Sequence, residues 1–150
     1  MKSHYRAVVI GGGVVGASAL YHLAKMGWND VVLVEKIEYT SGSTWHAAGL
    51  LPLFNMSYSV GKIHKYSVDL YQSLEEETGQ HVSFHKTGNL RLARNQERMD
   101  EYKRYCGTAS TIGVPFEMIG PAEIKKLWPF AKVDDLVGAI YHPDDGHVAP

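Results

Sequence analysis

Arg6-Ala7-Val8-Val9-Ile10-Gly11-Gly12-Gly13-Val14-Val15-Gly16 is the stretch that decides the fold of this chain. Residues 6–10 form a continuous apolar run, which is typical of a parallel strand covered on both faces. Residues 11–25 then carry apolar side chains at helical spacing, and Gly27 is placed to end that helix. Val31–Val34 repeats the buried-strand pattern. The sequence therefore predicts a βαβ unit of the Rossmann type over residues 6–35.

The glycines in this unit match the G-x-G-x-x-G pattern of dinucleotide-binding turns. Gly11 permits a tight turn, Gly13 lets the backbone approach a pyrophosphate, and Gly16 allows the helix to pack closely on the strand. The helix N-terminus would face the phosphates, and Glu35, about 20 residues further on, would accept hydrogen bonds from ribose hydroxyls. The pattern predicts an adenine dinucleotide without separating FAD from NAD. The alternative is a glycine-rich turn that binds nothing.

A polar loop of small residues around Trp45 and His46 follows the ribose-binding acid, over residues 40–49. Its backbone and hydroxyl donors suit a pyrophosphate. An extended chain from Glu35 to His46 would span roughly 36 Å, enough to reach the far end of a flavin. A single histidine is nevertheless more often structural than a cofactor ligand.

Ser41-Gly42-Ser43-Thr44-Trp45-His46-Ala47-Ala48-Gly49-Leu50 closely resembles the flavin-attachment segment of the dimethylglycine and sarcosine dehydrogenases, within the D-amino-acid-oxidase-like flavoproteins. The likeness continues through residues 74–80, 88–93 and 145–150. It implies FAD bound covalently through His46, whose neutral imidazole would attack the flavin. Motif and resemblance together assign these residues to the cofactor: Gly11, Gly13, Val14, Val15, Gly16, Glu35, Lys36, Ser43, Thr44, His46, Ala48, Gly49 and Leu50.

The resemblance also implies a reaction. Family members oxidise an N-methyl amino acid to an iminium, releasing formaldehyde or passing the one-carbon unit to tetrahydrofolate, with oxygen or an electron-transfer flavoprotein as acceptor. They are several times longer, so this chain is expected to be an inactive N-terminal fragment. Most catalytic residues and a folate-binding region would then lie beyond Pro150. A non-catalytic flavin-fold regulatory protein and an NAD-binding dehydrogenase remain alternatives.

The rest of the chain changes character from parallel βαβ to α+β. We expect amphipathic helices over residues 60–78 and 99–112, an antiparallel pair within 82–93, a strand within 114–119, a short helix after Gly120, and a strand over 137–141. The predicted organisation is a first FAD-binding segment (1–80), the start of a substrate domain with antiparallel strands (81–141) and a return toward the FAD-binding domain (142–150).

Composition narrows the partners and the compartment. The formal charge is -1, from 15 basic and 16 acidic residues, which gives no footprint for nucleic acid or an anionic membrane. No apolar run approaches the roughly 20 residues that cross a bilayer. The single cysteine, Cys106, fits a reducing compartment, so we expect a cytoplasmic protein, or a mitochondrial matrix protein if the chain is processed.

The remaining polar candidates are weaker. The histidines lack the short paired spacing of zinc motifs, so no metal site is expected. His147 is the one further histidine for which the resemblance implies a place near the flavin. Arg91 could pair with a substrate carboxylate, although an arginine on a strand is more often solvated.

Overall fold

The structure is a computed structural model that describes residues 2–149. The chain divides into two compact units, one ending at Ala48 and one spanning Gly49–Ala149. No helix in the described residues is long and apolar enough to cross a membrane. The domain boundaries expected at residues 80 and 141 remain predictions.

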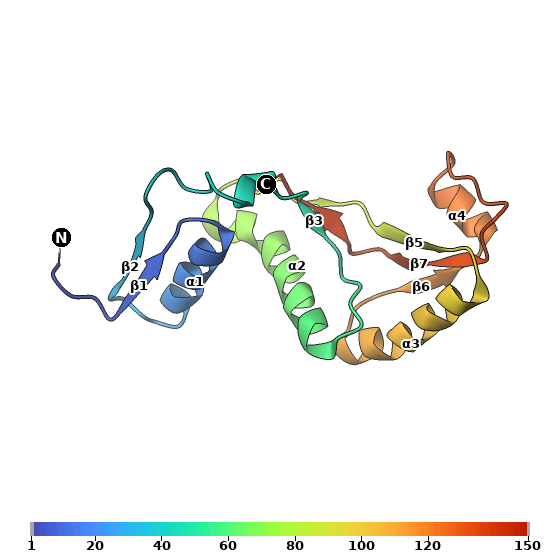
Figure 1. Cartoon of the computed structure of the whole chain (residues 1–150), viewed down its shortest axis with the longest axis horizontal. Coiled ribbons are helices and arrows are strands. Elements are labelled where there is room, and N and C mark those ends of the chain that lie inside the picture. Colours follow the sequence, from blue (N-terminus) through green and yellow to red (C-terminus); the bar gives the residue numbers. More distant parts are fainter. Residues whose placement is uncertain (1, 150) are drawn as a thin grey trace. The chain divides into compact units, whose positions relative to one another are not determined.

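The first unit contains the predicted βαβ arrangement. Strands β1 (Ala7–Ile10) and β2 (Val31–Val34) are joined by helix α1 (Val14–Lys25), and all three are drawn in blue in Figure 1. The strands are parallel, with Ala7 opposite Val31 and Ile10 opposite Val34. The prediction of a Rossmann-type unit is confirmed.

Helix α1 ends at the glycine that the sequence marked. Gly27 adopts a left-handed φ of 84°. Its N–H donates to the Ala24 carbonyl at 2.9 Å, and the Trp28 N–H donates to the Leu23 carbonyl at 3.0 Å. These two bonds form a Schellman motif, which satisfies carbonyls that the helix end would otherwise leave unpaired.

The sheet of this first unit is covered on one face only, whereas the apolar run predicted cover on both. A Cβ at Gly16 would lie 3.4 Å from the Val9 side chain, so α1 packs on the Val9 face. Val8 and Ile10 point the other way and are 53% and 86% exposed. The described residues of the first unit supply no second layer there, and α1 itself has no fully buried residue.

The second unit begins with strand β3 (Leu50–Leu51) and contains two long helices, α2 (Tyr58–Thr78) and α3 (Gln96–Ile112). The Asn95 side chain caps α3 by accepting the Arg98 N–H at 2.9 Å. Gly79 and Gly113 end the two helices in left-handed conformations. The predicted helices are therefore confirmed, with their ends set by cap residues.

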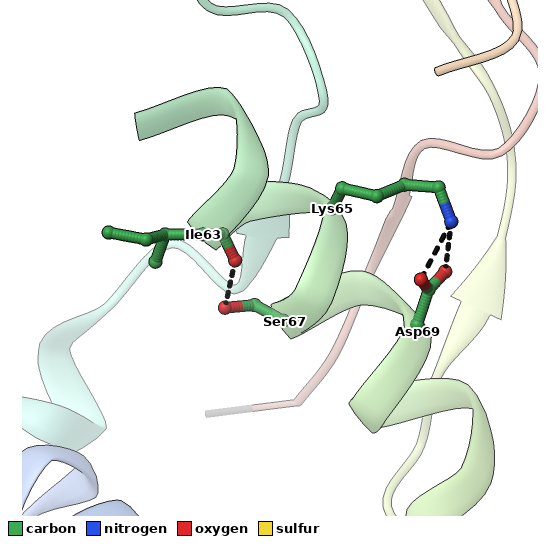
Figure 2. Close-up of polar contacts among 4 residues, drawn as sticks. All are labelled: Ile63, Lys65, Ser67 and Asp69. Carbon is green, nitrogen blue, oxygen red and sulfur yellow. Dashed lines mark hydrogen bonds and ion pairs between the residues drawn. The ribbon is translucent and has the colours of Figure 1, made fainter. Parts of the chain in front are cut away.

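Helix α2 carries its polar side chains on the surface. Figure 2 shows Lys65 paired with Asp69 one turn later, and the Ser67 hydroxyl bonded to the Ile63 carbonyl. Gly61 and Val68 are the buried residues of α2.

The strands of the second unit form two small antiparallel sheets. One has the order β5 (Asn89–Ala93), β7 (Gly138–His142), β6 (Glu117–Ile119), with the short helix α4 (Pro121–Leu127) following β6 (Figure 1). The other has the order β3, β8 (Gly146–His147), β4 (His85–Lys86).

The antiparallel pair predicted within residues 82–93 is wrong. Strand β4 pairs with β8, and β5 pairs with β7, so the two segments lie in different sheets. The turn between them does not reverse the chain, since β4 and β5 run antiparallel to β8 and β7 in turn. The N–H groups of Thr87 and Gly88 donate to the Asp145 carbonyl at 3.2 and 2.8 Å. The apolar alternation was real, but the partners of both strands come from the end of the chain.

The hydrophobic core lies in the second unit. Its larger cluster joins α2, α3 and the β5–β7–β6 sheet, and contains Leu53, Val68, Ala93, Tyr102, Tyr105, Ala109, Val114 and Ile140. A smaller cluster around Ile124 and Ala139 packs α4 against the same sheet.

Candidate dinucleotide-binding site

The glycine-rich turn has the geometry that close helix–strand packing requires. Gly11 takes a φ of 105°, open to glycine but strained for other residues. A Cβ at Gly16 would lie 1.8 Å from the Gly11 carbonyl oxygen, which no side chain could tolerate. The Gly11 N–H donates to the Val34 carbonyl at 2.8 Å. The turn is thus fixed to the end of β2, where Glu35 follows.

Glu35 is held against this turn by backbone hydrogen bonds. Its Oε2 accepts the Gly12 N–H at 2.6 Å, and its Oε1 accepts the N–H groups of Lys36 at 2.6 Å and Ile37 at 3.1 Å. The bond from Gly12, followed by those from Ile37 and Lys36, lowers the pKa of Glu35. A carboxylate offers about four acceptor positions, so one on Oε2 is left for a hydroxyl.

Three residues that the sequence analysis did not single out complete the turn. The Tyr39 ring lies so close to Gly12 that a Cβ there would come within 2.5 Å of it. The Thr40 N–H donates to the Gly12 carbonyl at 3.0 Å, and Thr40 has a φ of 63°, unfavourable for a β-branched residue. Gly12 was visible in the motif, but no local pattern marks Tyr39 or Thr40.

The loop after Thr40 returns to the N-terminus of α1. Thr44 Oγ1 accepts the Val14 N–H at 3.0 Å, and a Cβ at Gly13 would lie 2.9 Å from the same oxygen. The first hydrogen bond of α1 runs from the Ala17 N–H to the Gly13 carbonyl. The N–H groups that precede Ala17 therefore have no partner within the helix. Thr44 and these donors meet where an anion would be stabilised.

His46 lies in a short 3₁₀ turn, η1 (Thr44–His46), and is exposed. Its Nδ1 is 3.1 Å from the Gly42 carbonyl, so Nδ1 carries the hydrogen and donates, because a carbonyl only accepts. The ring packs against Trp45, with centroids 3.8 Å apart at 37°. In a neutral imidazole this leaves Nε2 with the free electron pair.

The structure brings Gly11, Gly13, Val14, Gly16, Glu35 and Thr44 together around the turn. Several other predicted contacts are exposed: Val15, Lys36, Ser43, Ala48 and Leu50. Gly49 and Leu50 belong to the second compact unit, at the start of β3.

A buried polar cluster in the second unit was not predicted. Asp145 Oδ1 accepts the Leu53 N–H at 2.9 Å, and Tyr105 donates from its hydroxyl to the Leu53 carbonyl at 3.3 Å. His142 Nε2 lies 3.2 Å from the same hydroxyl. Asp145 Oδ2 and His142 Nδ1 have no hydrogen-bond partner in the described part of the chain.

Burial shifts the pKa of Tyr105, Asp145 and His142 in the direction that favours the neutral form of each side chain. Burial and the Asp145 charge raise the pKa of Tyr105 to about 12. Burial raises the pKa of Asp145 to about 6, although the Leu53 hydrogen bond and the Arg91 charge oppose it. Burial and the Arg91 charge lower the pKa of His142 to about 4.

Arg91 adds a cation to this cluster. Its guanidinium carbon lies 4.4 Å from the centroid of the Phe54 ring, and its buried Nε has no partner within residues 2–149. This is a cation–π contact with a half-buried arginine, not a fully solvated side chain. A contact with a substrate carboxylate stays a prediction.

The turn, the acid and the helix N-terminus define a dinucleotide-binding βαβ unit. A sequence model of the family described as FAD dependent oxidoreductase matches residues 6–150. The chain belongs to this family.

Its relatives are considerably longer. The chain is 47% identical to the mitochondrial dimethylglycine dehydrogenase of Rattus norvegicus over 149 residues, which are 99% of this chain and 17% of that protein. It is 43% identical to the mitochondrial sarcosine dehydrogenase of Homo sapiens over 151 residues, covering 100% of this chain and 16% of the relative. The chain thus spans about a sixth of the length of these two relatives.

A solved structure supports the same fold. The L-proline dehydrogenase from P. horikoshii superposes with a TM-score of 0.90 at 32% identity, covering 100% of this chain and 39% of that one. The expected fold class, α/β continuing into an α+β region with antiparallel strands, is confirmed.

Proposed function

We propose that this chain forms the FAD-binding part of an oxidoreductase that oxidises an N-methyl amino acid, of the dimethylglycine or sarcosine kind, with demethylation. The observation that carries the proposal is the closed turn, in which Gly16 packs on Gly11 and Glu35 is locked to Gly12. Family membership supports FAD, and the names of the relatives support the amine substrate.

The residues around the turn fit an adenosine diphosphate group. Glu35 would accept a ribose hydroxyl at the free position of Oε2, and the α1 N-terminus would donate to the pyrophosphate. Gly13 has no side chain to hinder this approach, and the Thr44 hydroxyl can donate to a phosphate oxygen while accepting from Val14. When bound, FAD supplies the hydride acceptor.

His46 is our candidate for covalent attachment through Nε2, since Nδ1 is engaged with the Gly42 carbonyl. The test uses the full-length protein that contains this chain, precipitated with acid after loading with FAD. Flavin should stay with the precipitate of the native protein and leave with the supernatant for His46→Ala. His81→Ala, an exposed histidine paired with Glu75, is the matched control. Retention by His46→Ala would contradict the attachment.

Substrate reduction tests the activity separately from the attachment. Adding sarcosine or dimethylglycine without oxygen should bleach the flavin absorbance at about 450 nm. A bound flavin that no N-methyl amino acid reduces would instead support a non-catalytic flavin-fold protein. A purified protein with bound NAD and no flavin would support a nicotinamide-dependent dehydrogenase.

The remaining expectations belong to the whole protein. We propose oxygen or an electron-transfer flavoprotein as acceptor, and tetrahydrofolate as a carrier bound outside this chain. Reoxidation of the reduced enzyme by air, compared with reoxidation by an electron-transfer flavoprotein, decides between the acceptors. The relatives named above are mitochondrial proteins, which favours the matrix over the cytoplasm for a eukaryotic source.

A further inference from the structure

His85 and His147 lie opposite each other in the β3–β8–β4 sheet. They are Cα partners in the antiparallel pairing of β4 with β8, so both side chains project from the same face. Their ring centroids are 5.1 Å apart and their planes meet at 31°. His85 is exposed and His147 is partly exposed. Neither ring is hydrogen-bonded to any other group in the described part of the chain.

We propose that this pair binds a divalent late first-row transition-metal ion, copper(II) most tightly. Neutral imidazole nitrogens are suitable ligands for such ions, and copper(II) stands highest in their affinity order. The two strands already hold both rings beside each other. The ion would therefore not need to reorganise the backbone to obtain two ligands.

The spacing of the rings fits shared coordination. A metal–nitrogen bond of about 2.05 Å plus about 1.1 Å from nitrogen to ring centre places the ion about 3.2 Å from each centroid. For centroids 5.1 Å apart, this corresponds to a nitrogen–metal–nitrogen angle of about 105°. That angle lies between adjacent positions of a square-planar site, about 90°, and those of a tetrahedral site, about 109°.

The surroundings limit the site to two protein ligands. Within residues 2–149, no group of three or more His, Cys, Asp or Glu side chains could hold a metal. Lys86, which follows His85 in β4, forms an ion pair with Asp144, which lies just before β8. This pairing offsets the repulsion that Lys86 would exert on a cation. Water or a small chelator would fill the other coordination positions.

Copper(II) nitrilotriacetate is the most selective probe, because its chelator leaves two adjacent coordination positions for imidazoles. A single isolated histidine fills only one of them and should bind the complex more weakly. The full-length protein should bind one such complex at this site. The electron paramagnetic resonance spectrum should show coupling to two imidazole nitrogens. His85→Asn and His147→Asn should each weaken binding at least tenfold, whereas His81→Asn should leave it unchanged.

Circular dichroism of each variant checks that the fold is kept, because both positions lie in short strands. Coupling to a single imidazole, or binding that survives both substitutions, would overturn the proposal. The readout does not depend on flavin, so its failure is distinct from failure of the proposed oxidoreductase function.

Discussion

The two units of this chain are stabilised by different means. The first, up to Ala48, holds its glycine-rich turn through backbone hydrogen bonds to Glu35 and through close glycine contacts, while Ile10 is 86% exposed. The second encloses a core in which Ile140, Tyr105 and Leu53 are almost completely buried. The comparison teaches that the candidate cofactor site depends on exact backbone geometry, and the second unit on apolar burial.

The largest expected effect is loss of core packing in the second unit. Ile140 is fully buried on β7 beneath α3, so Ile140→Ala should lower the free energy of unfolding by about 2–5 kcal/mol. Ile10→Ala removes a similar side chain from the exposed face of β1 and should change it by no more than about 0.5 kcal/mol. Urea denaturation of both variants measures the difference. Equal losses would show that the first unit has a core after all.

The next effect concerns the turn itself. Gly16→Ala places a methyl group against the Gly11 carbonyl, and we expect a destabilisation of about 1–3 kcal/mol together with loss of FAD binding. Gly107→Ala is the control, since that glycine lies in α3 with no atom within 4 Å of its added Cβ. It should stabilise the chain by about 0.5–1 kcal/mol. Flavin retention and denaturation measure both outcomes, and FAD binding unchanged in Gly16→Ala would contradict the site.

These contrasts also explain what the sequence could predict. The βαβ unit was predictable because its signals are local: Gly11, Gly16 and Gly27 each stand where the backbone requires glycine. The capped helices were predictable for the same reason, through Asn95 and Gly79.

Contacts between distant segments escaped prediction. The partners of β4 and β5 come from the end of the chain, so local alternation wrongly suggested that these strands pair with each other. The same is true of the histidine pair in β4 and β8, and of the buried carboxylate of Asp145. In the candidate site, motif spacing identified Glu35, but only three dimensions show Tyr39 packed on Gly12.

The carboxyl groups of Glu35, in the first unit, and Asp145, in the second, differ in the direction of their pKa shifts. Three backbone N–H bonds lower the pKa of the accessible Glu35, whereas burial raises that of Asp145 to about 6. Because the folded pKa of Asp145 is raised, its contribution to stability is complete below pH 3.8 and is lost as pH rises through about 6. The pKa of His142 is lowered from 6.5 to about 4, which has the opposite effect. Its contribution to stability is complete above pH 6.5 and is lost as pH falls toward 4.

Between pH 4 and 6.5 the native chain should therefore show little net pH dependence from this pair, because the loss from Asp145 and the gain from His142 have opposite signs. Asp145→Asn keeps an oxygen to accept the Leu53 N–H but removes the titrating carboxyl group, so that only the His142 contribution still changes with pH. Relative to the native chain, the stability of this variant should therefore rise with pH across this range, by roughly 3 kcal/mol. Urea denaturation at several pH values tests this. The same pH profile in both proteins would show that Asp145 does not titrate in this window.

The smallest expected effect comes from exposed ion pairs, which both units possess. Lys65 and Asp69 pair one turn apart on α2, as Figure 2 shows, and Lys2 pairs with Asp30 in the first unit. Lys65→Met should cost about 0.3–0.5 kcal/mol at low salt, and Lys2→Met no more than about 1 kcal/mol. Both losses should shrink at high salt, because exposed charges are screened. If they do, exposed ion pairs contribute little to either unit, and the units differ through backbone geometry in the first and apolar burial in the second.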